Sequence, residues 1–181
     1  ITTLFPIASA LALSIAIEKT FEIRPELKWP NDLTIKGKKI AGMLVDVSLE
    51  SNKIESLVLG TGVNFDVNVK EIEKTLKKIP NFYGVASLSE QKKKIKPIKL
   101  IQSFLIELEK IYKSLENRQT GKIISEWTKR SSTIGKIVEL NIINGKIKGK
   151  AIRIDNDGAL VVSENKKNHR VIAGDIIHLS K

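Results

Sequence analysis

The spacing of apolar residues divides this chain of 181 residues into two regions. In the first, long apolar or amphipathic stretches alternate with short apolar runs bounded by Gly, Pro, Asn and Asp, which predicts helices packed against a sheet. From Lys136 onward, short apolar runs follow one another closely, with Asn-Gly at residue 144 and Asp-Gly at residue 157 as turn signals. Five strands in so short a segment favour a small SH3-like barrel. We therefore predict an α+β fold, with one domain over residues 1–134 and an all-β domain over residues 135–181.

Four segments of the first region have helical patterns. Residues 4–20 are apolar nearly all round and predict a buried helix, while residues 69–78 and 122–129 predict shorter helices. Residues 97–115 predict an amphipathic helix that begins with a proline, which suits a first turn. Its predicted inward face consists of Ile98, Ile101, Leu105, Leu108, Ile111, Tyr112 and Leu115.

The strands predicted within residues 23–63 carry unusual residues at their ends. Lys28 stands immediately before a Pro-Asn-Asp break, and Asn64 follows a Gly-Thr-Gly exit. Gly42 lies inside a strand, where glycine usually marks a bulge or a place at which a ligand approaches the backbone. A lysine and asparagines around such glycines predict a small polar pocket for an anionic ligand.

Three motifs follow one another here: Lys-Trp-Pro-Asn-Asp-Leu from residue 28, Lys-Lys-Ile-Ala-Gly-Met-Leu-Val from residue 38, and Gly-Thr-Gly-Val-Asn from residue 60. In order and spacing they resemble the central motif series of biotin protein ligases (biotin–[acetyl-CoA-carboxylase] ligases). The resemblance covers nearly the whole chain. It implies a class II synthetase-like mixed sheet with helices, followed by the C-terminal SH3-like module of that family.

The activity implied by the resemblance is a two-step ligation that uses ATP. The biotin carboxylate attacks the α-phosphate of MgATP to give biotinyl-5′-AMP and pyrophosphate, and a lysine of a biotin carboxyl carrier domain then attacks the mixed anhydride. Biotin, ATP and Mg²⁺ are thus the implied ligands. The implied partner is the carrier domain of acetyl-CoA carboxylase or a related carboxylase, and a basic ligase surface would suit an acidic carrier.

The resemblance also assigns roles to individual residues. Lys28 is the implied catalytic residue, in contact with the biotin carboxylate and with the charge that develops on the phosphate. Met43 and its neighbours are implied to line the biotin site, and Asn64 to face the phosphates or magnesium. The implied ligand-binding residues are Lys28, Asn31, Gly42, Met43, Leu44 and Asn64. Taken singly, a strand-end lysine usually reaches solvent and asparagine serves turns, so these roles depend on the motif series.

Other chemistries are excluded or weakened by the residues present. The chain has no cysteine, so disulfides, thiolate metal sites and cysteine nucleophiles are excluded. Phe65 replaces the third glycine of a dinucleotide-binding loop, and Arg153 stands where a calcium loop starting near residue 153 needs its first ligand. His169 and His178 have no partners at metal-ligand spacing, so no metal site is predicted. These features suit a reaction driven by positioning and charge stabilisation.

A net charge of +11 admits a second class of function. Attraction to nucleic acid would make the chain a basic SH3-like nucleic-acid-binding or scaffold protein. The lysines recur along the whole chain, however, and the densest run, residues 92–96, lacks interleaved aromatic residues, which favours solvated faces. A lipoate ligase-like acyltransferase ranks lower, because such enzymes share the architecture in outline but lack the Lys-Trp-Pro-Asn-Asp series.

The apolar segment at residues 1–17 is too short for a membrane span and has no basic region before it, so we expect a cytoplasmic protein. Compared with the family, the chain lacks the Gly-Arg-Gly-Arg-type loop and the Ser-Thr-Asn element that precede the first helix, and it contains no DNA-binding domain. We therefore expect an N-terminally incomplete catalytic domain, with weak or no activity by itself. The sheet edge exposed in this way would permit a homodimer.

Overall fold

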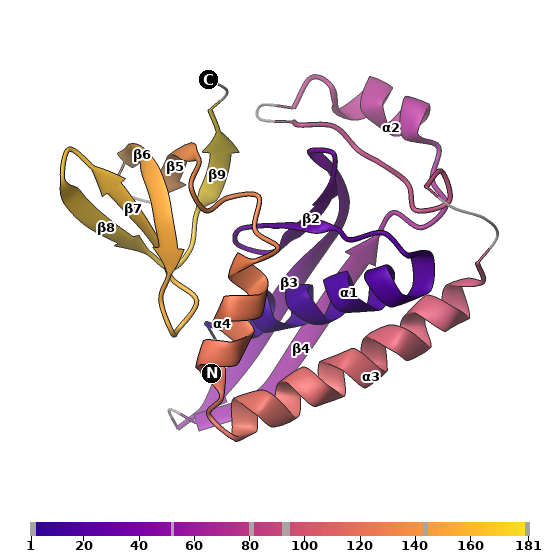
Figure 1. The fold of residues 1–181 in the computed structure, drawn as a ribbon, viewed down its shortest axis with the longest axis horizontal. Helices are drawn as coiled ribbons and strands as arrows, with labels where there is room; N and C mark the ends of the chain where they lie inside the picture. Colours follow the sequence, from indigo (N-terminus) through magenta and orange to yellow (C-terminus); the bar gives the residue numbers. More distant parts are fainter. Residues whose placement is uncertain (1–2, 52, 80–81, 92–94, 143–144, 180–181) are drawn as a thin grey trace.

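The computed structural model describes residues 3–51, 53–79, 82–91, 95–142 and 145–179, which form two sheets with helices packed on the first (Figure 1). The helices are α1 (Phe5–Phe21), α2 (Val69–Leu76), α3 (Pro97–Glu116) and α4 (Thr120–Thr128). The strands of the first sheet are β1 (Glu26–Lys28), β2 (Asp32–Ile35), β3 (Lys38–Glu50) and β4 (Lys53–Val63). Those of the second sheet are β5 (Ile137–Ile142), β6 (Gly145–Ile154), β7 (Leu160–Glu164), β8 (Lys167–Val171) and β9 (Asp175–His178). No helix within the described ranges combines the length and the apolar character of a membrane span.

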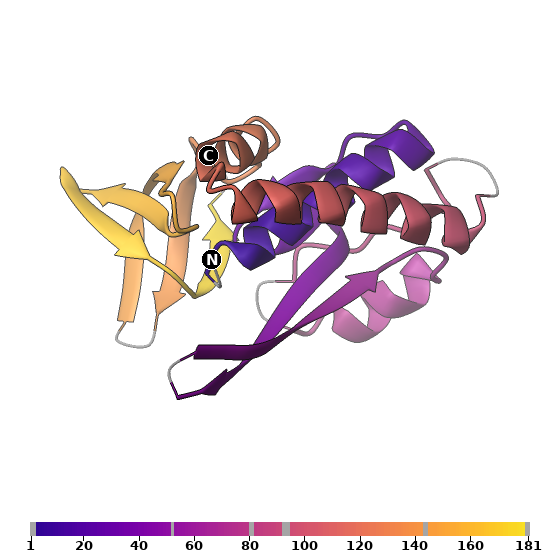
Figure 2. The same cartoon turned by 90° about the horizontal axis from the view of Figure 1, so that it is seen from below.

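The first helix, α1, is buried on nearly all sides, as its uniformly apolar sequence predicts. It lies against the first sheet, and α3 runs alongside it on the same side of that sheet (Figures 1 and 2). Pro6 occupies its first turn, and Glu22 ends it in the left-handed region at φ 58°. Even Ser14 is buried, and its hydroxyl donates to the Pro25 carbonyl oxygen at 3.2 Å. This helix is the support on which the strands of the site rest.

The first sheet has the order β1-β2-β3-β4, and each of these strands runs antiparallel to its neighbours. The expectation of a mixed sheet is wrong for the described residues, because no two strands of this sheet pair in parallel. The parallel contacts are isolated bridges, from Leu27 to Ser131 and from Lys39 to Val85. The first strand is also shorter than predicted. Prolines flank it closely on both sides, and proline cannot donate to a ladder.

The buried face of α3 agrees with the predicted one at Ile111 and Leu115 and differs from it elsewhere. The buried apolar residues of this helix are Leu100, Ile111 and Leu115. Four residues of the predicted inward face are instead 47–57% exposed, namely Ile98, Ile101, Leu105 and Tyr112. The buried face also contains Glu107, whose carboxylate pairs with Lys19 of α1 and with Lys110, each at 2.8 Å. Apolar residues surround much of this helix, so the packing against α1 decides which stripe is buried.

The second sheet has the order β8-β7-β6-β5-β9 and is antiparallel throughout. All five predicted strands are present, although β8 begins at Lys167 rather than at Arg170. Gly158 adopts φ 90° in the turn between β6 and β7, as the Asp-Gly signal predicts. The Asn-Gly turn predicted at residue 144 falls partly outside the described residues. Within the described ranges, β8 and β9 form the two edges of this sheet.

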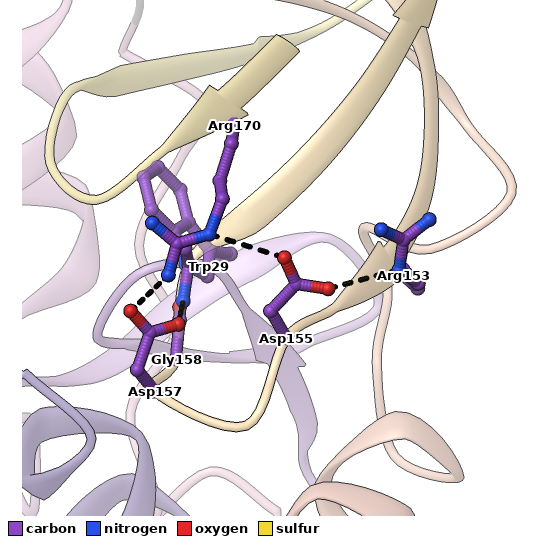
Figure 3. A network of polar contacts seen from close by, with 7 residues as sticks. Trp29, Arg153, Asp155, Asp157, Gly158 and Arg170 are labelled. Carbon is purple, nitrogen blue, oxygen red and sulfur yellow. Dashed lines mark hydrogen bonds and ion pairs between the residues drawn. The ribbon is translucent and has the colours of Figure 1, made fainter. Parts of the chain in front are cut away.

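The turn between β6 and β7 joins the second sheet to the strand end that carries Lys28. The Trp29 indole nitrogen donates to the Gly158 carbonyl oxygen at 3.1 Å, in a fully buried setting (Figure 3). The Trp29 backbone N–H donates to the Thr133 hydroxyl oxygen at 3.1 Å. Gly158 also packs against the N-terminal segment, since an added Cβ would lie 3.0 Å from the Thr3 carbonyl oxygen. Trp29 therefore links the two sheets as well as filling the core.

The same turn is the segment whose sequence resembles part of a calcium loop. Its carboxylates form ion pairs with arginines (Figure 3). Asp155 pairs with Arg153 at 2.9 Å and with Arg170 at 3.1 Å, and Asp157 pairs with Arg170 as well. The hydrogen bond from Arg170 is the main reason why the pKa of Asp157 lies below its usual range. The carboxylates are thus neutralised by the protein itself, and the segment is a turn, as the sequence predicts.

Candidate functional site

A cavity of about 690 Å³ opens on the first sheet where β3 and β4 pair. Its lining residues are Asn31, Asp32, Lys39, Ala41, Gly42, Met43, Leu44, Gly60, Thr61, Gly62, Val63 and Asn64. All three sequence motifs therefore contribute to one cavity. Its volume is within the range of small-molecule sites. In the following we call it the sheet cavity.

The space available to a side chain differs between two glycines of the sheet cavity, Gly42 and Gly62. A Cβ at Gly42 would lie 3.0 Å from both Asp32 Oδ1 and Lys39 Nζ, which form an ion pair at 2.5 Å. A side chain at position 42 would therefore crowd this ion pair. At Gly62, by contrast, an added Cβ would meet nothing closer than the Gly42 carbonyl oxygen at 3.9 Å. Packing does not require glycine there, and its absence of a side chain leaves bare backbone facing the cavity, as expected where a ligand approaches closely.

The structure places the predicted apolar lining at the sheet cavity. Met43 and Leu44 are neighbours on β3, so their side chains point to opposite faces of the sheet. Met43 is buried, and the Thr61 hydroxyl lies 3.5 Å from its sulfur, while Leu44 is 66% exposed. The cavity therefore has an apolar rim in Leu44. Thr61 and Val63, which sequence analysis did not nominate, complete the lining from β4.

Both predicted asparagines line the sheet cavity, and both also brace its wall. The Asn31 amide donates to the Met43 carbonyl oxygen, and the Met43 N–H donates back to the Asn31 carbonyl oxygen at 3.0 Å. The Asn64 amide donates to the Lys39 carbonyl oxygen at 3.0 Å. The bracing role that asparagine commonly has in turns is thus observed at both positions.

Lys28 does not line the sheet cavity. It lines a second cavity of about 240 Å³, which we call the junction cavity because residues of both sheets form it. Its other lining residues are Thr34, Gly37, Tyr83, Ser132, Ile176, Ile177 and His178. Lys28 is only 7% exposed, and burial lowers its pKa to about 8, with the charge of Lys39 acting in the same direction and that of Asp32 opposing it. The structure therefore separates the predicted catalytic lysine from the five other predicted residues.

Asp32 connects the two cavities. It lines the sheet cavity and stands opposite Lys28 in the pairing of β1 with β2. Its carboxylate accepts a hydrogen bond from the Tyr83 hydroxyl at 2.5 Å and pairs with Lys39. Burial, the Asp32 charge and this hydrogen bond all raise the pKa of Tyr83, so the phenol stays protonated and acts as the donor.

His178 closes the junction cavity from the second sheet. Its Nε2 lies 3.1 Å from the Thr133 hydroxyl oxygen. Burial lowers the pKa of His178 to about 4, and the charges of Lys28 and Lys136 add to this effect, so the imidazole is neutral at pH 7. Among the described residues, no group of three or more His, Asp or Glu side chains could hold a metal ion.

Sequence analysis missed Tyr83 and His178 as site residues. Tyr83 lies in a segment without periodic pattern, 51 residues from Asp32 along the chain. His178 lies on the last strand of the second sheet. No local spacing signal marks either residue, since both reach Lys28 only through the packing of distant segments.

Comparison with known proteins finds family models that match both parts of the chain. A model of the Biotin/lipoate A/B protein ligase family matches residues 3–64, which contain all three motifs. A model of the Biotin protein ligase C terminal domain matches residues 133–179. Both parts of the chain thus resemble ligases of the biotin and lipoate class.

Within that class, the similar proteins are biotin protein ligases. The bifunctional ligase/repressor BirA of Bacillus subtilis (strain 168) is 30% identical over 169 residues, which cover 93% of this chain and 50% of BirA. The biotin–[acetyl-CoA-carboxylase] ligase of Mycobacterium tuberculosis is 26% identical over 177 residues, covering 96% of this chain and 61% of that ligase. The resemblance to biotin protein ligases is therefore confirmed. The chain spans about half the length of the first of these curated relatives.

Solved structures share the fold. The crystal structure of biotin protein ligase from Aquifex aeolicus gives a TM-score of 0.81 at 21% identity and covers 98% of this chain and 76% of that chain. The same ligase in complex with biotin and ATP gives a TM-score of 0.74 at 23% identity, covering 98% of this chain and 71% of that chain. The predicted α+β class is thereby confirmed.

Proposed function

We propose that this chain is part of a biotin protein ligase, which joins biotin to one lysine of a biotin carboxyl carrier domain with ATP as the second substrate. One observation carries the proposal: three motifs that are separate in the sequence line a single cavity on the sheet. The names of the similar proteins support it, since one is a biotin–[acetyl-CoA-carboxylase] ligase and a solved neighbour holds biotin and ATP.

The sheet cavity suits a ligand with a compact apolar body and a carboxylate. Leu44 offers an exposed apolar side chain, Met43 adds its backbone on the same strand, and the bare backbone at Gly62 permits close approach of a ring. The Lys39 ammonium also lies in the wall, where its ion pair with Asp32 offsets its charge. Biotin has this combination of a fused ring, an aliphatic chain and a terminal carboxylate, so we place it here, with Asn31 and Asn64 toward its polar end and the phosphates.

The proposed chemistry needs positioning and charge stabilisation more than a side-chain nucleophile. A biotin carboxylate oxygen attacks the α-phosphorus of MgATP, the bond to pyrophosphate breaks, and biotinyl-5′-AMP forms. The neutral amine of the carrier lysine then attacks the acyl carbon, AMP leaves, and a proton is released. Lys28, with its pKa near 8, is mostly protonated at pH 7 and can stabilise the negative charge of the first step.

We further propose two domains: a class II synthetase-like catalytic domain over residues 1–134 and an SH3-like barrel over residues 135–181. Each of these ranges contains its own sheet, and a separate family model matches from residue 133 onward. Trp29, Thr133 and His178 would then hold the barrel against the catalytic strands. The proposed partner is an acidic carrier domain, because the net charge of +11 favours such a partner electrostatically.

Intact-mass spectrometry of a biotin carboxyl carrier domain tests this proposal. The carrier is incubated with the chain, biotin and MgATP, and we expect a gain of one biotin that requires both small molecules. Lipoate in place of biotin is the matched control and should leave the carrier unchanged. The chain covers only about half the length of the first curated relative, so it could bind biotin without completing the reaction. Thermal unfolding with biotin or with lipoate is therefore measured in parallel. No mass gain together with no biotin-dependent rise in Tm contradicts the proposal.

A further inference from the structure

The surroundings of Lys28 are unusual for a buried lysine. Its ammonium lies 3.3 Å from the centre of the Tyr83 ring, whereas no ion pair of Lys28 is recorded among the described residues. An aromatic face attracts a cation through its quadrupole and leaves the net positive charge in place. A carboxylate in direct contact would cancel that charge. A ring is therefore the partner that keeps a buried lysine available to a phosphate or a carboxylate.

The Tyr83 ring is itself held in place from two sides. Its hydroxyl donates to Asp32 at 2.5 Å, and Asp32 is fixed by Lys39. The backbone next to Tyr83 is attached to β3, because the Lys39 N–H donates to the Gly84 carbonyl oxygen and the Ala86 N–H donates to the Lys39 carbonyl oxygen, each at 3.0 Å. The ring is thus preorganised relative to the strand that lines the sheet cavity.

Tyr83 contacts one residue of each cavity. It touches Lys28 in the junction cavity through its ring, and it touches Asp32 of the sheet cavity through its hydroxyl. We propose that Tyr83 is a positioning residue for Lys28: its ring holds the ammonium in the junction cavity without cancelling its charge, and the hydroxyl bond to Asp32 helps to fix the ring. This inference rests on the proposed role of Lys28 in adenylate formation.

Proton NMR of the 181-residue chain tests the contact without any need for activity. The ring current of Tyr83 should move the Lys28 ε-methylene resonance upfield of the group formed by exposed lysines, and Lys28→Arg identifies that resonance by its disappearance. We expect Tyr83→Phe, which keeps the ring, to retain the upfield shift, and Tyr83→Leu to lose it. A wild-type Lys28 resonance among those of the exposed lysines overturns the proposal, provided that thermal unfolding shows a folded chain.

Adenylate formation separates a positioning role from a merely structural one. For Tyr83→Leu we expect kcat to fall about tenfold, with KM for biotin and ATP changed less than about twofold, because the ring acts on the lysine and not on the substrates. Tyr83→Phe should recover most of this loss. Equal losses in both variants, or a loss confined to KM, contradict the role. Absence of adenylate with wild type counts against the proposed function alone, and the NMR experiment still decides the contact.

Discussion

The two cavities of this chain are built in opposite ways. The sheet cavity is formed by neighbouring strands, and three glycines are among its lining residues. The junction cavity is formed by segments far apart in the sequence, and its character comes from buried ionisable side chains, Lys28 and His178, whose pKa values are both lowered by burial. A binding surface can thus form within one sheet. A lysine or histidine with a lowered pKa, by contrast, has to be buried by several parts of the chain.

This difference has a consequence for mutations. Changes in the sheet cavity should alter affinity, because they change the shape that meets the ligand. Changes in the junction cavity should alter rate or stability, because they change a charge or the contact between the two sheets. The following predictions, from the largest effect to the smallest, test this division.

Replacement of Lys28 should have the largest effect. For Lys28→Met, which keeps the length and removes the charge, we expect adenylate formation to fall by on the order of a hundredfold or more, as for the loss of a preorganised electrostatic group. Pyrophosphate release measures the rate, and biotin affinity should change little. The matched control is Lys129→Ala, a lysine on the protein surface. Near-wild-type turnover in Lys28→Met would show that Lys28 is not the catalytic residue.

Filling the sheet cavity should weaken binding without unfolding the protein. Gly62→Ala places a methyl group whose nearest neighbour among the described residues is the Gly42 carbonyl oxygen at 3.9 Å, so the fold should accept it while the ligand loses that space. We expect Kd for biotin to rise about tenfold, measured by isothermal titration calorimetry. Gly121→Ala, in α4 with no atom near its added Cβ, is the control and should leave Kd unchanged. Unchanged affinity in Gly62→Ala would place the ligand elsewhere.

The link between the sheets should be visible in stability. Trp29→Phe loses the hydrogen bond to the Gly158 carbonyl oxygen, whereas the indole nitrogen of the equally buried Trp127 has no hydrogen-bond partner among the residues that the structure describes. We expect Trp29→Phe to lower the free energy of unfolding by about 1 kcal/mol more than Trp127→Phe, since both lose similar volume. Urea denaturation measures the difference. Equal losses would mean that the indole hydrogen bond does not hold the sheets together.

His178 should contribute a pH dependence to stability. Its pKa in the folded protein is about 4, below the ordinary value of 6.5, so the unfolded chain binds more protons between these values. Stability from this group is therefore fully present above pH 6.5 and is lost as the pH falls toward 4. We expect Tm of wild type to fall more steeply over this range than Tm of His178→Gln, measured by calorimetry. Parallel curves would show that His178 titrates normally.

The sequence predicted the elements well where local pattern decides them. The uniformly apolar run of α1 could only be buried, and the Asp-Gly signal marks the β6–β7 turn whatever surrounds it. It predicted the buried face of α3 only in part. Ile111 and Leu115 are buried as predicted, but apolar side chains occur on several sides of that helix, and only the packing on α1 selects the face that is buried. The same limit applies to the mixed sheet, since strand direction depends on pairing between segments.

For the site, the sequence motifs predicted correctly that Asn31, Gly42, Met43, Leu44 and Asn64 lie together. Neighbouring antiparallel strands and the ends of these strands place such residues side by side. The motif series did not reveal that Lys28 lies in a separate cavity. Nor could it find Tyr83 or His178, which meet Lys28 across long stretches of chain.

The sequence alone therefore determined the element types, the motif series and the glycines that leave backbone open at the sheet cavity, since these follow from local propensity and from residues a few positions apart. The tertiary structure decided the charge state and the partners of Lys28. Burial and the approach of an aromatic ring depend on which distant segments pack together, and the pKa of a group responds to that enclosure and not to its neighbours in the chain.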